Sequence, residues 1–278
     1  MAELAAPLPI RRYLRPAKIR NAVRRRTFIS RVTGGVKLDQ SIPVEWLGTA
    51  YGGWPIPMQF VEPDWVVYCL GAGMDVTFET ELIKRAGCDV YTFDPGDESA
   101  EYVTGLNEPK LHFDQVAIWC EDGTLSMYQS PVTWPASLSA SNLDLGTNRI
   151  QVPCRSIESL MEEKGHDHID LLRYHVEGSE YEIFDPQMLR EIDVQILGMR
   201  FFHTAPARAA LKLIKAIETE GYLPVAREGT GFTFVHKGLP ERAREARRRR
   251  AAAAAAPAHR HARQRGPARP GIASRRDS

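Results

Sequence analysis

Residues 65–94 constrain the fold more strongly than any other part of the sequence. They open with an apolar run, rich in β-branched and aromatic residues, that is followed at once by Gly71 and Gly73. An unbroken run of this kind is typical of a strand buried on both faces of a parallel sheet. A helix-patterned segment then ends at Gly87, and a second apolar run ends at Asp94. We therefore predict a strand–helix–strand unit here.

This unit is typical of proteins that bind a nucleoside. Glycine at positions 71 and 73 allows a sharp turn and lets a ligand approach the backbone amides. Asp94 follows Gly71 by 23 residues, at the expected tip of the second strand, where a carboxylate can accept hydrogen bonds from ribose hydroxyls. An ordinary strand-to-helix turn is the alternative, because Gly-x-Gly alone is a weak signal.

The loop itself favours one class of nucleoside. Val76 stands where a dinucleotide-binding loop needs a third glycine or an alanine. Asp75 would bring a carboxylate beside a pyrophosphate, and desolvating two like charges together is unfavourable. S-adenosyl-L-methionine has no phosphate, and its amino and sulfonium groups are cationic. We therefore expect this cofactor, with Gly71, Gly73 and Asp75 at its methionine part and Asp94 at its ribose, and an NAD-dependent oxidoreductase is disfavoured.

The charge distribution divides the chain into three parts. Residues 1–38 and residues 241–278 each carry a net charge of +9, and the whole chain carries +1, so residues 39–240 carry −17. We predict one domain over residues 39–240, long enough for a single hydrophobic core. Residues 1–38 are then a basic N-terminal arm. Residues 241–278, rich in Arg, Ala and Pro, form a low-complexity tail that we expect to be disordered.

The basic arms leave several partners open. The N-terminal arm, with three arginines at 24–26, suits nucleic acid, an anionic membrane surface or a transit peptide, but we favour a solvated arm that docks on the acidic core. No segment reaches the roughly 20 apolar residues of a membrane span, and no secretory signal is visible. The cysteines lack a Cys-x-x-Cys pair, which is typical of reduced thiols, so we expect a cytoplasmic protein.

A second informative stretch begins with a predicted strand over residues 169–175. In an open α/β sheet, ligands bind outside the carboxyl ends of the strands. Arg173, His175 and Glu177 therefore lie where chemistry is expected, although His175 alternatively serves only as a hydrogen-bonded strand end. Ser179 and Glu182 have the spacing of a capping box for a following helix.

The region between these stretches has less specific signals. Residues 46–57, with aromatic residues around two glycines and then two prolines, suit a lid or ligand-contacting loop, or alternatively an edge strand with a tight turn. Residues 111–120 read as one strand closed by a hairpin-like turn at 121–123. Residues 123–150 read as an irregular loop in contact with substrate. We expect Asp114 or Glu121 to face the adenine side of the ligand. The alternative is that these residues are solvated acids in turns.

The remaining elements complete an α/β pattern. We predict helices over 97–106, from Ser156 to Gly165 and from about Thr204 to Gly221, with strands at 195–199, 222–226 and 231–236. His166-Asp167-His168 lacks a nearby third ligand, so we expect no metal.

Two stretches taken together resemble the FkbM family of S-adenosyl-L-methionine-dependent methyltransferases. They are Gly-Ala-Gly-Met-Asp-Val-Thr-Phe-Glu with Val-Tyr-Thr-Phe-Asp-Pro at 71–95, and Ile-Asp-Leu-Leu-Arg-Tyr-His-Val-Glu-Gly-Ser-Glu-Tyr-Glu at 169–182. The resemblance covers about 46–235, including Tyr-Gly-Gly-Trp at 51–54. It implies a Rossmann-like, mostly parallel sheet with helices on both faces, methyl transfer that is often to a hydroxyl oxygen, and cofactor contacts at Gly71, Gly73, Asp75 and Asp94.

The chain departs from the family pattern at two acids. The family usually reads Lys-x-Asp-x-Glu-Gly, where this sequence has Arg173, His175 and Glu177 followed by Gly178. Arg200 stands where the family often shows Glu before an aromatic-His pair. Either the acceptor is more anionic than usual, or transfer activity is weakened.

We therefore expect a methyltransferase that acts on a hydroxyl of a small molecule or sugar. An imidazole with a pKa near ~6.5 can take a proton at neutral pH, so His175 is the candidate base. Glu177 would orient His175 or the acceptor, and Arg173 completes the catalytic group. The alternatives are a catalytically silent cofactor-binding interaction module, and a nucleic-acid methyltransferase that uses the basic arms, against which the −17 central part counts.

Overall fold

A computed structural model describes residues 16–129, 138–140, 148–245 and 248. The chain divides into two compact units, Met1–Leu239 and Pro240–Ser278. In the second unit residues 240–245 are helical, and the prediction of a disordered tail falls mostly outside the described residues. The prediction for residues 1–15 and part of that for 123–150 also fall outside them.

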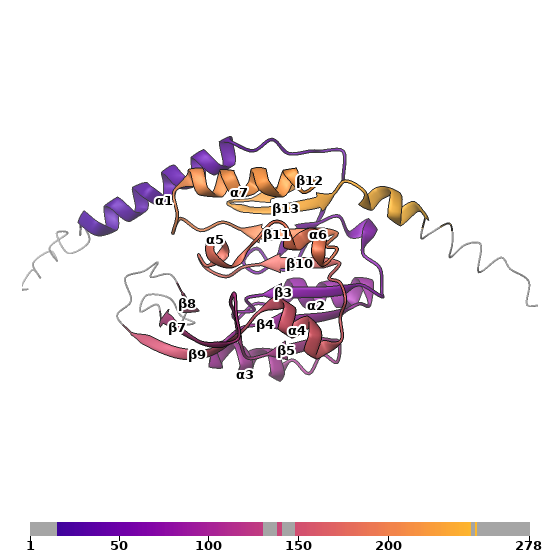
Figure 1. Ribbon diagram of the computed structural model, residues 1–278, viewed down its shortest axis with the longest axis horizontal. Coiled ribbons are helices and arrows are strands. Elements are labelled where there is room, and N and C mark those ends of the chain that lie inside the picture. The colour runs from indigo at the N-terminus through magenta and orange to yellow at the C-terminus, as the bar shows by residue number, and fades with distance from the viewer. Residues whose placement is uncertain (1–15, 130–137, 141–147, 246–247, 249–278) are drawn as a thin grey trace, which may run out of the picture. The chain divides into compact units, whose positions relative to one another are not determined.

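A seven-stranded sheet forms the centre of the first unit, in the order β12–β13–β11–β10–β3–β4–β5 (Figure 1). β3, β4, β5, β10 and β11 pair in parallel, and only β13 runs antiparallel to its neighbours β11 and β12. The strands are β3 (Val66–Leu70), β4 (Asp89–Phe93), β5 (Leu111–Asp114), β10 (Leu171–Tyr174), β11 (Ile196–Arg200), β12 (Tyr222–Glu228) and β13 (Gly231–His236). The predicted Rossmann-like α/β architecture is confirmed.

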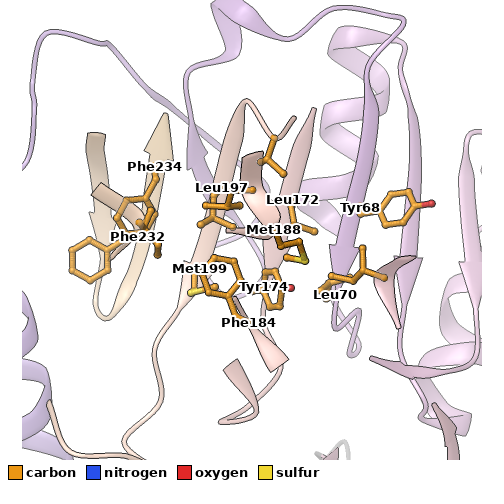
Figure 2. Close-up of a cluster of buried hydrophobic side chains, with 14 of the residues drawn as sticks. Tyr68, Leu70, Leu172, Tyr174, Phe184, Met188, Leu197, Met199, Phe232 and Phe234 are labelled. Atoms are coloured by element: carbon orange, nitrogen blue, oxygen red, sulfur yellow. The ribbon is translucent and has the colours of Figure 1, made fainter. Parts of the chain in front are cut away.

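Both faces of the sheet are covered, which explains the unbroken apolar strands. Alternate residues of a strand point to opposite faces, so Tyr68 and Leu70 join one core cluster while Val67 and Cys69 join another. Figure 2 shows the first cluster, in which aromatic and aliphatic side chains from neighbouring strands pack together. Its helices are α1 (Pro16–Gly34), α4 (Ile157–Lys164), α6 (Met188–Glu191) and α7 (Ala207–Thr219). The second cluster holds α2 (Thr77–Ala86) and the β1–β2 pair (Glu45–Leu47, Trp54–Ile56).

Two helices end at the glycines that the sequence predicts, and one of them begins at its predicted cap. α2 ends at Gly87, which has a left-handed φ of 76° and donates its N–H to the Ile83 carbonyl. α4 begins at Ser156, whose hydroxyl accepts a hydrogen bond from Ser159 N, and it ends at Gly165 with φ 71°. The predicted helix over 97–106 is observed as α3 (Asp97–Gly105).

The N-terminal helix α1 is anchored on α7. Phe28 and Val32 are buried in the first core cluster, whereas the arginines at 24–26 are exposed. The division between arm and domain at residue 38 stays a prediction. Of the helices in the described part of the chain, none is both long and apolar enough to cross a membrane.

The region 111–150 differs from the prediction. Residues 111–120 do not form one strand, because β5 ends at Asp114 and β6 (Ala117–Ile118) joins a different sheet. That second sheet has the order β6–β9–β7–β8, with β7 (Gly123–Gln129), β8 (Leu138–Ser139) and β9 (Arg149–Arg155). The predicted irregular loop is therefore wrong for 123–129, 138–139 and 149–150. The hairpin-like turn at 121–123 is also wrong, because β6 and β7 each pair with β9 and not with each other.

The predicted capping box at Ser179 and Glu182 is wrong as well. Ser179 itself has helical backbone angles, φ −78° and ψ −11°, and its side chain caps no N–H of the short helix α5 (Glu180–Ile183). A capping side chain needs an extended backbone to reach the next turn, and Ser179 lacks it.

Candidate active site

A cavity of about 520 Å³ lies at the carboxyl ends of the parallel strands, between the main sheet and the second sheet. Ligands bind at this edge of open α/β sheets, because the loops that leave the strands diverge there. The structure brings all seven predicted site residues to this cavity: Gly71, Gly73, Asp75, Asp94, Arg173, His175 and Glu177.

Gly71 permits a close approach between β3 and β10. Its φ is +91°, and a Cβ built there would lie 2.2 Å from the His175 carbonyl oxygen. Any other residue would have to displace that backbone. Gly73 differs, because a Cβ there would meet nothing within 4 Å although φ is +55°. The first glycine thus brings two strand ends together, and the second leaves open space in the loop.

Asp94 is fixed at the end of β4 by two backbone hydrogen bonds. Its Oδ2 accepts from Gly73 N at 2.9 Å, and its Oδ1 accepts from Gly96 N at 2.8 Å. An ionised carboxylate has about four lone-pair sites, so each oxygen retains acceptor capacity. Asp94 can therefore hold the glycine loop and accept hydrogen bonds from a ligand hydroxyl at once.

Asp75 joins the glycine loop to the segment between β1 and β2. One oxygen accepts from Thr77 N at 3.0 Å and Thr77 Oγ1 at 2.5 Å, and the other accepts from Thr49 Oγ1 at 2.5 Å and Gly52 N at 3.1 Å. Burial alone would raise the pKa of Asp75, but these hydrogen bonds outweigh it and hold the pKa below its usual value. The group is therefore ionised at neutral pH.

The segment Gly48–Gly53 is held against the cavity from several sides. Gly48 N donates to Glu81 Oε2 at 2.7 Å, and Thr49 N donates to Thr77 Oγ1 at 2.9 Å. Tyr51, at the tip of this segment, lines the cavity and is 78% exposed. The flanking strands β1 and β2 pair with each other, as the edge-strand alternative expected. Ligand contact by this segment stays a prediction.

Arg173 lies beneath that segment and is only 3% exposed. Its Nη1 donates to Glu79 Oε1 at 2.7 Å, and its Nη2 donates to the Gly52 carbonyl at 3.1 Å. The guanidinium also packs on the rings of Trp54 and Phe78. The pKa of Glu79 is raised, because burial outweighs the lowering effect of Arg173, but the two side chains form a direct ion pair at 2.7 Å. The charge of Arg173 is thus matched within the protein, and Arg173 holds the segment that carries Tyr51.

Glu79 was not predicted as a site residue. A signal was present, because it occupies a position of α2 that the helical spacing of Phe78, Leu82 and Ile83 assigns to the buried face. A carboxylate at such a position needs a buried partner, which Arg173 provides.

His175 stacks on Phe202, with ring centroids 5.7 Å apart. Burial and the nearby charges of Arg173 and Arg200 hold the pKa of His175 well below its usual value, so the imidazole is neutral at physiological pH. Glu177 adopts a left-handed backbone with φ 48°, and its carbonyl accepts a hydrogen bond from Ser139 Oγ at 2.6 Å. A non-glycine residue in this conformation is strained, and such strain is concentrated at functional sites.

Glu180 is a second buried carboxylate that was not predicted as a site residue. It is fully buried, and it accepts from Phe202 N at 2.6 Å and from Gly178 N at 2.9 Å. It therefore joins the loop after β10 to the loop after β11. Burial raises its pKa to about 7 despite the two hydrogen bonds. Its signal in the sequence was its place in the Glu-Gly-Ser-Glu motif at 177–180.

The other candidates lie away from the cavity. Asp114 pairs with Lys164 Nζ at 2.6 Å, and neither Asp114 nor Glu121 lines the cavity. His166 Nδ1 is 2.8 Å from Tyr68 Oη, and His168 lies between Asp167 and Asp170. Across the described ranges, no group of three or more His, Cys, Asp or Glu side chains is arranged to hold a metal.

The fold and the cavity define an α/β protein with a candidate site at the carboxyl edge of its parallel strands. The methyltransferase FkbM domain matches residues 67–224, and the chain belongs to this family.

Comparison with solved structures gave matches that include two proteins. The fibrillarin pre-rRNA processing protein of Methanococcus jannaschii has 9% identity and a TM-score of 0.39, over 73% of this chain and 86% of its own. SMU.1697c of Streptococcus mutans, proposed to be a methyltransferase and solved in complex with SAH, has 12% identity and a TM-score of 0.32, over 64% of this chain and 90% of its own. Comparison with curated proteins found no match.

Proposed function

We propose that the protein is an S-adenosyl-L-methionine-dependent methyltransferase that acts on a hydroxyl oxygen of a small molecule or sugar. The observation that carries this proposal is the pair of anchored carboxylates at the glycine loop, Asp75 and Asp94.

The lining residues suit a cationic nucleoside without phosphate. The lowered pKa of Asp75 keeps a negative charge at the loop, which would repel a pyrophosphate and attract an amino or sulfonium group. Asp94 retains lone pairs for ribose hydroxyls, and Gly73 leaves open space beside it. These three residues and Gly71 would hold S-adenosyl-L-methionine, which supplies a methyl group already activated by its sulfonium.

The protein must then align the acceptor and take its proton. His175 is neutral and stacked on Phe202, so an unprotonated ring nitrogen is available at physiological pH. Glu177, in its strained conformation beside His175, would orient the acceptor hydroxyl or stabilise the imidazolium. Arg173 was predicted to be catalytic, but its burial and its bonds to Glu79 and Gly52 support a positioning role.

Calorimetric titration of the full chain tests the cofactor. We expect S-adenosyl-L-methionine to bind, NAD not to bind, and Asp94→Ala to weaken binding at least tenfold, since a charge-assisted hydrogen bond of about 1.5–3 kcal/mol is lost. Asp167→Ala is the matched control, because its carboxylate is 96% exposed and remote from the cavity. A folded protein that does not bind S-adenosyl-L-methionine contradicts the proposal.

Transfer is tested separately. A His175→Ala variant that binds the cofactor and retains full turnover would remove His175 from the chemistry. Cofactor binding without transfer to any acceptor would instead favour the silent interaction module. Salt-sensitive binding and methylation of RNA or DNA would favour the nucleic-acid methyltransferase.

A further inference from the structure

We propose that the acceptor binds on an apolar face of the second sheet, and that it is an uncharged hydroxyl compound with an apolar portion. The inference rests on the proposed function, because that function places the cofactor at the glycine loop. It deepens the function by assigning the opposite wall of the same cavity to the acceptor.

The face is built by the two-residue periodicity of β7 and β9. Leu125 pairs with Val152, and Met127 pairs with Ile150. Because side chains alternate between the two faces of a sheet, these four lie on one face, and Leu138 extends it from β8. All five side chains line the cavity: Leu125, Met127, Leu138, Ile150 and Val152.

This face belongs to a different structural layer from the cofactor residues. The glycine loop and Asp94 follow strands of the main sheet, whereas β7, β8 and β9 belong to the separate four-stranded sheet, drawn to one side of it in Figure 1. Yet both border one continuous cavity. A molecule that lies on the face therefore reaches toward His175, the proposed base, and Glu177, which is proposed to orient the acceptor.

The charges around the cavity exclude an anionic acceptor. Among the described residues that line it, Arg173 is the only lysine or arginine, and its charge is matched by Glu79. His175 is held neutral. The remaining charged groups are carboxylates, those of Asp75, Asp94, Asp97, Glu98 and Glu177. The sequence left open a more anionic acceptor, because His175 and Arg200 stand where the family usually has acids. His175 is neutral, however, and Arg200 does not line the cavity and pairs with Glu228 at 2.8 Å.

An alkyl series measures the apolar contribution. Burying one methylene strengthens binding by about fourfold. We therefore expect the Kd of alkyl β-D-glucosides for the cofactor-loaded full chain to fall by about that factor per methylene, from methyl through butyl to hexyl. Hexyl β-D-glucuronide, with the same tail and a carboxylate on the sugar, should bind at least tenfold more weakly than the glucoside.

Two neighbouring substitutions locate the site. Met127→Glu puts a charge on the apolar face and should weaken hexyl glucoside binding at least tenfold. Ser126→Glu, the matched control, puts the same charge on the opposite face of β7, and this variant should bind hexyl glucoside as the wild type does. Titration with S-adenosyl-L-methionine establishes that both variants are folded and loaded.

The outcomes separate this inference from the proposed function. If the wild-type chain fails to bind S-adenosyl-L-methionine, the proposed function is refuted and the acceptor assignment with it. If the cofactor binds but the glucosides show no dependence on chain length, the inference alone is overturned. Equal loss of binding in both glutamate variants, or tighter binding of the glucuronide, also overturns it.

Discussion

Glu180 makes a quantitative prediction about pH and stability. Its pKa is raised from 4.5 to about 7 in the folded protein, with burial as the main cause. Between these values the folded state holds the proton and the unfolded state has released it, so stability falls as pH rises. Above pH 7 the folded state carries a buried carboxylate. The difference in pKa corresponds to about 3 kcal/mol of stability that is present below pH 4.5 and absent above pH 7.

Replacing Glu180 by Gln removes this titration. The wild type should lose about 2–3 kcal/mol of unfolding free energy relative to Glu180→Gln when the pH rises from 5 to 8. Urea unfolding at four pH values, followed by tryptophan fluorescence, measures the difference, and an unchanged m value shows that both proteins unfold alike. Glu182→Gln, two residues away and exposed, is the charge-matched control, and its unfolding free energy should change with pH as that of the wild type does.

If the unfolding free energies of the wild type and Glu180→Gln change in parallel with pH, the reasoning is refuted. Such parallel changes would mean that the hydrogen bonds from Gly178 and Phe202 offset the burial of the carboxylate, so that its pKa is ordinary. A difference of the opposite sign would mean that those bonds outweigh burial.

Three further predictions follow from other contacts. Gly71→Ala should destabilise the protein by about 1–3 kcal/mol more than Gly73→Ala, because only the Cβ added at Gly71 meets a backbone oxygen. Thermal and urea unfolding compare the stabilities of the two variants. Equal losses of stability would contradict the close approach of the backbone at Gly71. Arg173→Met should lower the free energy of unfolding by about 3–5 kcal/mol, because it leaves Glu79 buried and unpaired. The Arg173→Met/Glu79→Met double variant should recover most of that stability. Additive losses of unfolding free energy in the two single variants and the double variant would contradict a stabilising ion pair. The acidic limb of kcat against pH should lie below 6.5, since the pKa of His175 is lowered, and a midpoint at or above 6.5 would exclude His175 as the base.

The sequence predicted the elements whose signals are local. Apolar runs such as 66–70 are buried on both faces, and the pattern records that burial directly. Gly87 and Gly165 stop their helices through left-handed backbones, which few other residues adopt. The glycine loop and the ends of β4 and β10 meet because parallel strands present their carboxyl ends at the same edge.

The misses arose where the signal was weak or distant. β7 and β9 alternate apolar and polar residues, but residues 123–150 as a whole are polar, which is typical of a loop. The sequence places Glu79 on the buried face of a helix and Glu180 in the Glu-Gly-Ser-Glu motif, but it does not show what either carboxylate pairs with. Each is buried because of a partner that folding brings close: Arg173, 94 residues away, and Phe202 N, 22 residues away. Such pairs depend on tertiary structure and leave little trace in the spacing of residues.

The place of β13 in the sheet has a consequence for synthesis. β13 is made after β12, yet it lies between β12 and β11. Until residues 231–236 have been translated, β11 presents an open edge in the middle of the future sheet, and β12 has no neighbour with which to pair. Phe232 and Phe234, both fully buried in the finished protein, must enter last. A nascent chain paused just before this strand therefore exposes the edge of β11 and the unpaired β12 to wrong edge pairing.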